Sequence, residues 1–123
     1  MKKSIYSIFF FLSIFASCTY YNEEELFPNE VCDTENITYQ QDILPIFEKA
    51  CYSCHSSNTP VIYYGNLNLE NFDHIQKVVD DGQLLRNIKH ELDGLPMPQG
   101  GAKLSDCNIA KIEKWIIQGI PNN

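Results

Sequence analysis

The sequence predicts an all-α domain over residues 31–123. Apolar residues recur at helical spacing in several stretches, and capping side chains stand before two of them. No segment alternates apolar and polar residues over the length of a strand. The domain is too short to divide in two and contains no internal repeat, so we expect several short helices around one modest core.

The first helix is predicted to begin at Thr38 and to run towards Cys51. Thr38 and Gln41 have the spacing of a capping box, in which two side chains satisfy free backbone N–H groups. Pro45 lies inside this helix and is expected to kink or restart it, because proline has no N–H donor. Residues 56–66 contain proline and glycine and are expected to form a loop.

Three further helices are predicted. The first carries an apolar stripe that ends near Gly82, a second short one follows, and the last has Ser105 as N-cap and Asp106 in its first turn. The last helix ends at Gly119, and we interpret Trp115 on its apolar face as a packing residue. The three stripes are Phe72, Ile75, Val78 and Val79; Leu84, Leu85 and Ile88; and Ile109, Ile112, Trp115 and Ile116.

The strongest chemical signal is a CxxCH motif, which runs Cys51, Tyr52, Ser53, Cys54, His55. Two thiols at this spacing can add across the two vinyl groups of a haem, and the histidine that follows can reach the iron as an axial ligand. The motif therefore predicts one covalently attached haem c, bound through Cys51 and Cys54, with His55 as the proximal ligand.

Three other chemistries use a CxxC pair and remain alternatives. A thioredoxin-like redox pair needs a long helix after it, whereas His55 is followed by Ser, Ser, Asn, Thr and Pro. A structural zinc site needs a second pair of ligands at short spacing, whereas Cys32 and Cys107 stand far apart. A disulfide between Cys51 and Cys54 would give His55 no role.

The second axial position decides between an electron carrier and a ligand binder. Met97 is the one methionine besides the initiator, and it lies forty-two residues beyond His55 in a loop with two prolines and two glycines. Such a loop can hold one thioether rigidly, so Met97 is the predicted distal ligand. His90 and His74 are competitors, because histidine can also ligate haem iron, and an open position is the remaining alternative.

The N-terminus predicts export. Residues 1–17 have the pattern of a signal peptide, with two lysines before an apolar run that is too short to span a bilayer. Small residues precede Cys18, which resembles a bacterial lipoprotein processing site, although Phe15 stands where an aliphatic residue is usual. We therefore expect a lipid on Cys18, an acidic tether over residues 18–30, and a domain on the periplasmic or cell-surface side of a bacterial membrane. An ordinary secretory signal is the alternative.

The number of cysteines is odd, so disulfides alone would leave one free thiol in an exported protein. If Cys18 carries lipid and the motif carries haem, Cys32 and Cys107 remain and are expected to form a disulfide. That bond would close a loop of 75 residues and contribute about 4 kcal/mol by the chain-entropy estimate. Two separate buried thiols are the alternative, because sequence does not show that the two approach each other.

The charge of the chain restricts its partners. Removal of the signal leaves seven basic and sixteen acidic residues, a net charge of −9 before haem. This balance disfavours nucleic acid as a partner. It favours a redox partner protein with a basic or neutral docking surface.

A helix that leads into CxxCH, short helices after it and a helix at the C-terminus form the order of elements in class I c-type cytochromes. Most of residues 32–123 resembles the small monohaem cytochrome c domains of exported lipoproteins from Bacteroidetes-like bacteria. The residues that carry this resemblance are Met97, Leu104, Ser105, Asp106, Trp115, Ile116, Gly119, Pro121 and Asn122. The resemblance implies a cytochrome c-like fold of short helices around one haem c, with Met97 distal and electron transfer as the activity.

With both ligands supplied by the protein, we expect a carrier and not an enzyme. The rival hypothesis is a module that binds or senses a small gas at an open or histidine-ligated distal position. A third hypothesis is a haem-free interaction domain on a lipid tether.

Overall fold

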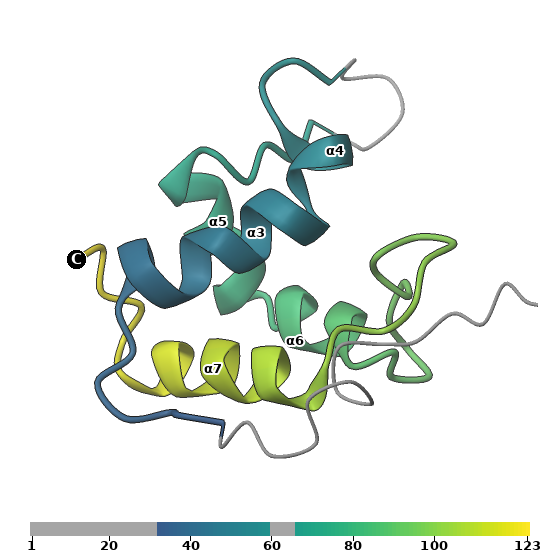
Figure 1. The fold of residues 1–123 in the computed structure, drawn as a ribbon. Coiled ribbons are helices and arrows are strands. Elements are labelled where there is room, and N and C mark those ends of the chain that lie inside the picture. The colour runs from purple at the N-terminus through teal and green to yellow at the C-terminus, as the bar shows by residue number, and fades with distance from the viewer. Residues whose placement is uncertain (1–31, 60–65) are drawn as a thin grey trace, which may run out of the picture. The chain divides into compact units, whose positions relative to one another are not determined.

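The computed structural model describes residues 32–59 and 66–123, which belong to the compact unit Val31–Asn123. Within these ranges the regular elements are helices and there is no strand, which confirms the predicted all-α class (Figure 1). None of the helices in these ranges is long and apolar enough to cross a membrane. The signal peptide, the lipidated Cys18 and the tether all fall outside the described residues.

The first helical segment consists of two parts. The π-helix η2 (Tyr39–Ile43) is capped by Thr38, whose hydroxyl accepts a hydrogen bond from the Gln41 N–H at 3.3 Å. Helix α3 (Leu44–Ala50) follows directly, with Pro45 in its first turn. Proline is tolerated there because the first N–H groups of a helix have no intrahelical acceptor. Pro45 therefore restarts the helix, one of the two outcomes expected for it.

The three short helices that follow are α4 (Tyr52–His55), α5 (Phe72–Asp80) and α6 (Gln83–Ile88). The side chain of Asn71 caps α5 by accepting a backbone N–H of its first turn at 2.9 Å. Gly82, at φ +68°, turns the chain from α5 into α6, a conformation that favours glycine. The predicted stripes thus form two helices separated at Gly82.

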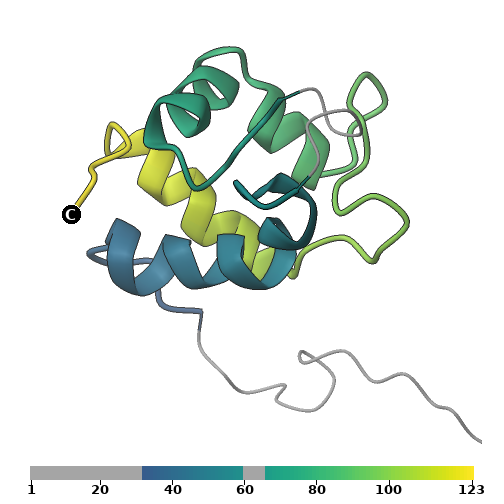
Figure 2. The same ribbon diagram turned by 90° about the horizontal axis from the view of Figure 1, so that it is seen from above.

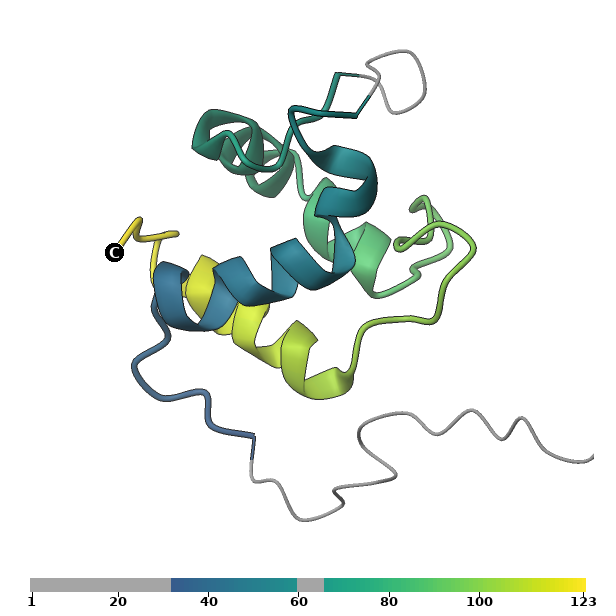
Figure 3. The same cartoon turned by 45° about the horizontal axis from the view of Figure 1, so that its top comes forward.

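Helix α7 (Asp106–Ile117) has the predicted N-cap, since the Ser105 hydroxyl accepts the Asn108 N–H at 3.2 Å. The chain leaves α7 through Gly119, at φ +86°. The backbone of the first helical segment approaches α7 through η2. Figures 2 and 3 show that the green loop between α6 and α7 projects from the helical body. This loop carries Met97.

Trp115 of α7 is the centre of the core. Its side chain is 0% exposed, and its ring lies 5.6 Å from that of Tyr39, 6.3 Å from Phe72 and 6.4 Å from Phe47, measured between centroids. The indole N–H donates to the Pro121 carbonyl at 2.9 Å, which satisfies the one polar atom of the buried ring. Packing is therefore the role of Trp115, as predicted. The other buried apolar residues are Ile37, Ile43, Ile46, Leu69, Ile75, Val78, Leu84, Ile88, Ile109, Ile112 and Ile120.

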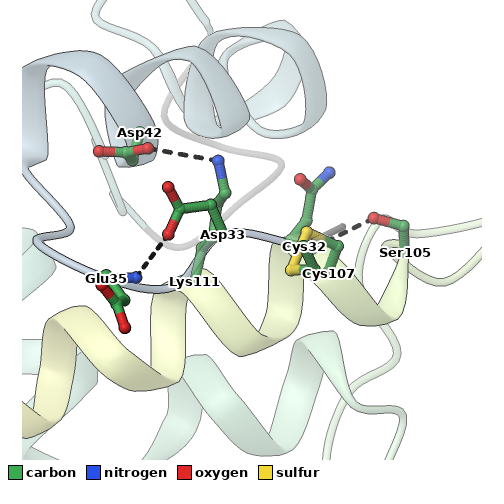
Figure 4. Close-up of a disulfide and its surroundings, with 8 residues drawn as sticks. Cys32, Asp33, Glu35, Asp42, Ser105, Cys107 and Lys111 are labelled. Carbon is green, nitrogen blue, oxygen red and sulfur yellow. Dashed lines mark hydrogen bonds and ion pairs between the residues drawn. A yellow bond between two sulfur atoms is a disulfide. The ribbon is translucent and has the colours of Figure 1, made fainter. Parts of the chain in front are cut away.

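A disulfide joins the segment before η2 to α7, and an ion pair joins η2 itself to α7 (Figure 4). Cys32 and Cys107, the pair expected from parity, are joined across 75 residues of sequence. Asp42 accepts hydrogen bonds from the N–H and hydroxyl of Thr38 and pairs with Lys111 at 3.3 Å. Burial opposes ionisation of Asp42, but the bonds from Thr38 and the Lys111 charge lower its pKa overall. The contribution of this contact to stability is therefore present at neutral pH and is lost as the pH falls through the lowered value.

We expect the double variant Cys32→Ser/Cys107→Ser to lose about 4 kcal/mol of unfolding free energy, because the unfolded chain regains the entropy of a 75-residue loop. Guanidinium denaturation of the haem-loaded domain measures the loss. A reducing agent is the matched control, since it should destabilise the native protein and leave the double variant unchanged. Equal effects of the reducing agent on both proteins would contradict the assignment.

Candidate functional site

The CxxCH motif occupies the junction of two helices. Cys51 lies between α3 and α4, where its N–H donates to the Phe47 carbonyl at 2.8 Å and its own carbonyl accepts the His55 N–H at 2.8 Å. These bonds keep the motif in one helical turn. Residues three and four positions apart share a helix face, so Cys51, Cys54 and His55 face the same side. Both motif cysteines are half-buried free thiols, not a disulfide.

This face opens onto a largely apolar cleft. An inner cavity of about 170 Å³ is lined by Cys51, Cys54 and His55 and, from the loop between α6 and α7, by Met97. A wider hollow of about 850 Å³ shares His55 and Met97 with the inner cavity, so the two form one cleft. Its apolar lining comes from α5, α6 and the adjoining loops. The residues concerned are Leu67, Leu69, Val78, Leu84, Ile88, Leu95, Pro96, Pro98 and Leu104.

His55 is held by the segment that follows the motif. Its Nδ1–H donates to the Leu67 carbonyl at 3.2 Å, and its own carbonyl accepts the Leu69 N–H at 2.8 Å. A bond from Nδ1 to a carbonyl selects the tautomer in which Nε2 carries the lone pair, and it raises the basicity of that nitrogen. Sequence reasoning missed Leu67, because a backbone acceptor leaves no signal in the residue type.

Met97 is held by the end of α6. Its N–H donates to the Asn87 carbonyl at 3.0 Å, while the Asn87 side-chain oxygen accepts the Leu95 N–H at 2.9 Å. Gly94 passes so close to α6 that a Cβ would lie 2.9 Å from the Arg86 carbonyl oxygen. Asn87 also lines both parts of the cleft. A polar side chain beside the apolar stripe of α6 was the one sequence signal that could have singled it out.

The two other histidines have different positions. His74 accepts the Asn68 N–H on its Nδ1 at 3.1 Å and lines only the wider hollow. His90 lines neither part of the cleft, and its Nε2–H donates to the Met97 carbonyl at 3.0 Å. Of the three residues predicted as candidates for the distal ligand, Met97 is therefore the one that lines the inner cavity together with the CxxCH face.

Comparison with protein families explains this arrangement. A model described as a haem-binding domain matches residues 9–93, which is more than half of the chain. The chain belongs to this haem-binding domain family. The matched segment contains the whole CxxCH motif and ends before Met97. No curated protein and no solved structure matches the chain.

The cleft of this haem-binding domain has the chemistry that haem requires. Apolar walls suit the porphyrin, thiols such as those of Cys51 and Cys54 can react with its two vinyl groups, and an imidazole and a thioether are groups that can ligate its iron. No group of three or more His, Cys, Asp or Glu side chains able to hold a metal ion occurs in the described ranges. The residues thus fit haem better than the ligand set of a structural zinc site.

The Cys51 thiol is protonated at neutral pH in the haem-binding domain without haem. Burial, with a further contribution from the neighbouring Cys54, raises the pKa of Cys51 to about 11 from an ordinary value of 9.0. The folded state therefore holds the proton more tightly than the unfolded state. The stability of the folded state is unaffected by this group below about pH 9, falls as the pH rises through the folded value of about 11, and then loses nothing further.

We expect Cys51 of the haem-free protein to react with iodoacetamide about a hundredfold more slowly than the same residue in urea at pH 8. The factor follows from the pKa difference between about 11 and 9.0, because the thiolate is the nucleophile. Mass spectrometry of digests taken over time at several pH values measures the rate, which should continue to rise up to about pH 11. Equal rates with and without urea would show that Cys51 is not buried before haem is attached.

Proposed function

We propose that this haem-binding domain is a membrane-tethered monohaem c-type cytochrome of class I that carries single electrons. The observation that carries the proposal is the presence of both CxxCH thiols, His55 and Met97 around one apolar cleft. When bound, haem supplies a one-electron couple between Fe(II) and Fe(III). The succession of short helices, with CxxCH after the first and Met97 before the last, supports the likeness to a cytochrome c fold.

Cys51 and Cys54 attach the haem in this proposal. Each S–H would add across one vinyl group, with the sulfur bonded to one vinyl carbon and the hydrogen to the other, so that nothing would be oxidised. The addition requires both cysteines as thiols, and neither is engaged in a disulfide in the fold. A protonated Cys51 cannot be alkylated readily at neutral pH, which supports attachment by a dedicated maturation system rather than spontaneously.

His55 and Met97 provide the axial ligands. The Leu67 carbonyl orients the His55 ring and increases its donor strength, while a thioether favours the ferrous state more than imidazole does. The apolar walls exclude water from the iron and disfavour the extra charge of the ferric state. The thioether and the apolar walls support a reduction potential on the high side for a haem protein, whereas a stronger histidine donor favours the ferric state and acts in the opposite direction. With both positions filled by the chain, the protein transports electrons and is not an enzyme.

The partner we propose is a redox protein with a basic or neutral docking surface. Beside Met97, the loop exposes Leu95, which is 70% exposed, and Leu92, which is fully exposed. Glu91 and Asp93 flank Leu92, and the whole chain has a net charge of −7. An apolar patch with acidic neighbours suits a partner with basic groups around an apolar centre.

Small-gas binding is the second candidate function, and the extent of the family match keeps it open. The match ends at residue 93, so it supports haem binding without reaching Met97. A weakly held Met97 would leave a position for an external ligand. Rapid binding of CO to the reduced native protein would favour this function over electron transfer.

We expect the signal-free domain, made in an exporting host that attaches haem c, to retain its haem after acid–acetone extraction. The ferric protein should show the weak long-wavelength charge-transfer band of methionine bound to iron. Met97→His should abolish this band and lower the potential by on the order of 0.1 V, within the roughly 0.8 V range that ligation and surroundings span. Visible spectra and a redox titration measure both effects.

The matched controls distinguish the ligand from the attachment site. Cys51→Ala/Cys54→Ala should lose its haem on extraction, whereas Ser56→Ala/Ser57→Ala, in the segment after the motif, should keep it. An unchanged spectrum and potential in Met97→His would remove Met97 from the site. A native protein that contains no haem would overturn the proposed function.

We also expect the full-length chain to fractionate with membranes through a lipid on Cys18. Mass spectrometry of the N-terminal peptide should show acylation of that cysteine, and Cys18→Ala should release the haem-loaded protein into the soluble fraction. Recovery of Cys18→Ala with the membranes in the same amount as the native chain would contradict lipid anchoring.

A further inference from the structure

His90 has no role as a ligand in the proposed function, yet its position is unusual. It lies two residues beyond α6 with φ +58°, in the left-handed region that side chains other than glycine seldom adopt. Histidine, asparagine and aspartate are the residues most often found there. In this conformation the half-buried ring of His90 reaches across to the loop and its Nε2–H donates to the Met97 carbonyl at 3.0 Å.

The backbones of His90 and Met97 are also held by the Asn87 carbonyl. The Asn87 carbonyl accepts both the His90 N–H at 3.2 Å and the Met97 N–H at 3.0 Å. Met97 is thus held through its N–H by Asn87 and through its carbonyl by His90. Among the described residues, the rest of the loop from residue 98 to 104 has a single backbone hydrogen bond, between the Gly101 N–H and the Pro98 carbonyl.

We propose that His90 is a positioning residue that fixes Met97 as the distal ligand. The inference rests on the proposed function and extends it. A bond to the Met97 carbonyl restricts the backbone from which the thioether projects, so it favours the state in which sulfur is available inside the cleft. Because the Nε2–H is used by the carbonyl, and the ring lines neither part of the cleft, His90 acts on the ligand through the backbone.

Two variants separate the hydrogen bond from the backbone strain. His90→Asn keeps a residue that tolerates positive φ but is too short to reach the Met97 carbonyl. His90→Gln retains an N–H donor of similar reach to the imidazole Nε2. We expect His90→Asn to bind added imidazole at the ferric iron about two- to tenfold more tightly than the native protein, because one net hydrogen bond no longer opposes release of Met97. His90→Gln should remain closer to the native affinity.

The measurements are imidazole titrations and the methionine charge-transfer band, followed with temperature, on haem-loaded protein. In His90→Asn the band should disappear at a lower temperature than in the native protein. His90→Gly, which also lacks the donor and suits a positive φ, gives the same comparison if His90→Asn binds little haem. Native behaviour of both His90→Asn and His90→Gly would overturn the positioning role, as would identical shifts in His90→Asn and His90→Gln.

The native spectrum separates this inference from the function on which it rests. If the native protein shows the methionine band and the variants behave like the native protein, His90 has no positioning role and the proposed function is unaffected. Covalent haem without that band in the native protein removes Met97 as the ligand and the positioning role with it. If the native protein has covalent haem without that band, a change of iron ligation in His90→Asn would identify His90 as the ligand itself.

Discussion

The buried ring of Trp115 is the contact on which the rest of the fold depends. Its neighbours come from η2, α3 and α5, so a single side chain of α7 holds together elements that are far apart in the sequence. The indole N–H is satisfied by the Pro121 carbonyl, which allows complete burial of the ring. Part of the apolar surface of α5 and α6 lines the cleft. A small domain has few ways to bury such surface, and a haem would cover it.

The two sides of the cleft are built with different degrees of local order. The CxxCH face is a continuous helical turn whose bonds connect residues four apart, and α3 supports it directly. Met97 instead lies on a loop and depends on contacts with α6 that involve Asn87 and His90. The positions of Cys51, Cys54 and His55 are therefore fixed by short-range structure, while the position of Met97 is fixed by a few hydrogen bonds. This asymmetry explains why the choice between an electron carrier and a ligand binder depends on the loop.

Local pattern made much of the fold and part of the site predictable. The caps at Thr38 and Ser105, the restart at Pro45 and the break at Gly82 were expected because each acts within one or two turns of its own position. The contacts made by Leu67, Asn87 and His90 were not expected. Each of them uses a backbone carbonyl, that of Leu67, Asn87 or Met97, and joins residues whose approach depends on the packed helices. From the sequence, His90 is a rival ligand or a surface histidine without a function, because the residue type says nothing of what its ring faces.

By itself the sequence determined that the domain is helical and that its first helix leads into a CxxCH motif. Both follow from spacing between near neighbours, since a helix sets which positions share a face and CxxCH sets two thiols and an imidazole in one turn. The tertiary structure decided which residues meet: Cys32 with Cys107, His55 with the Leu67 carbonyl, and Met97 with the motif across the cleft. These contacts depend on how the helices pack against one another. Packing results from many contacts between distant parts of the chain, which no short sequence pattern contains.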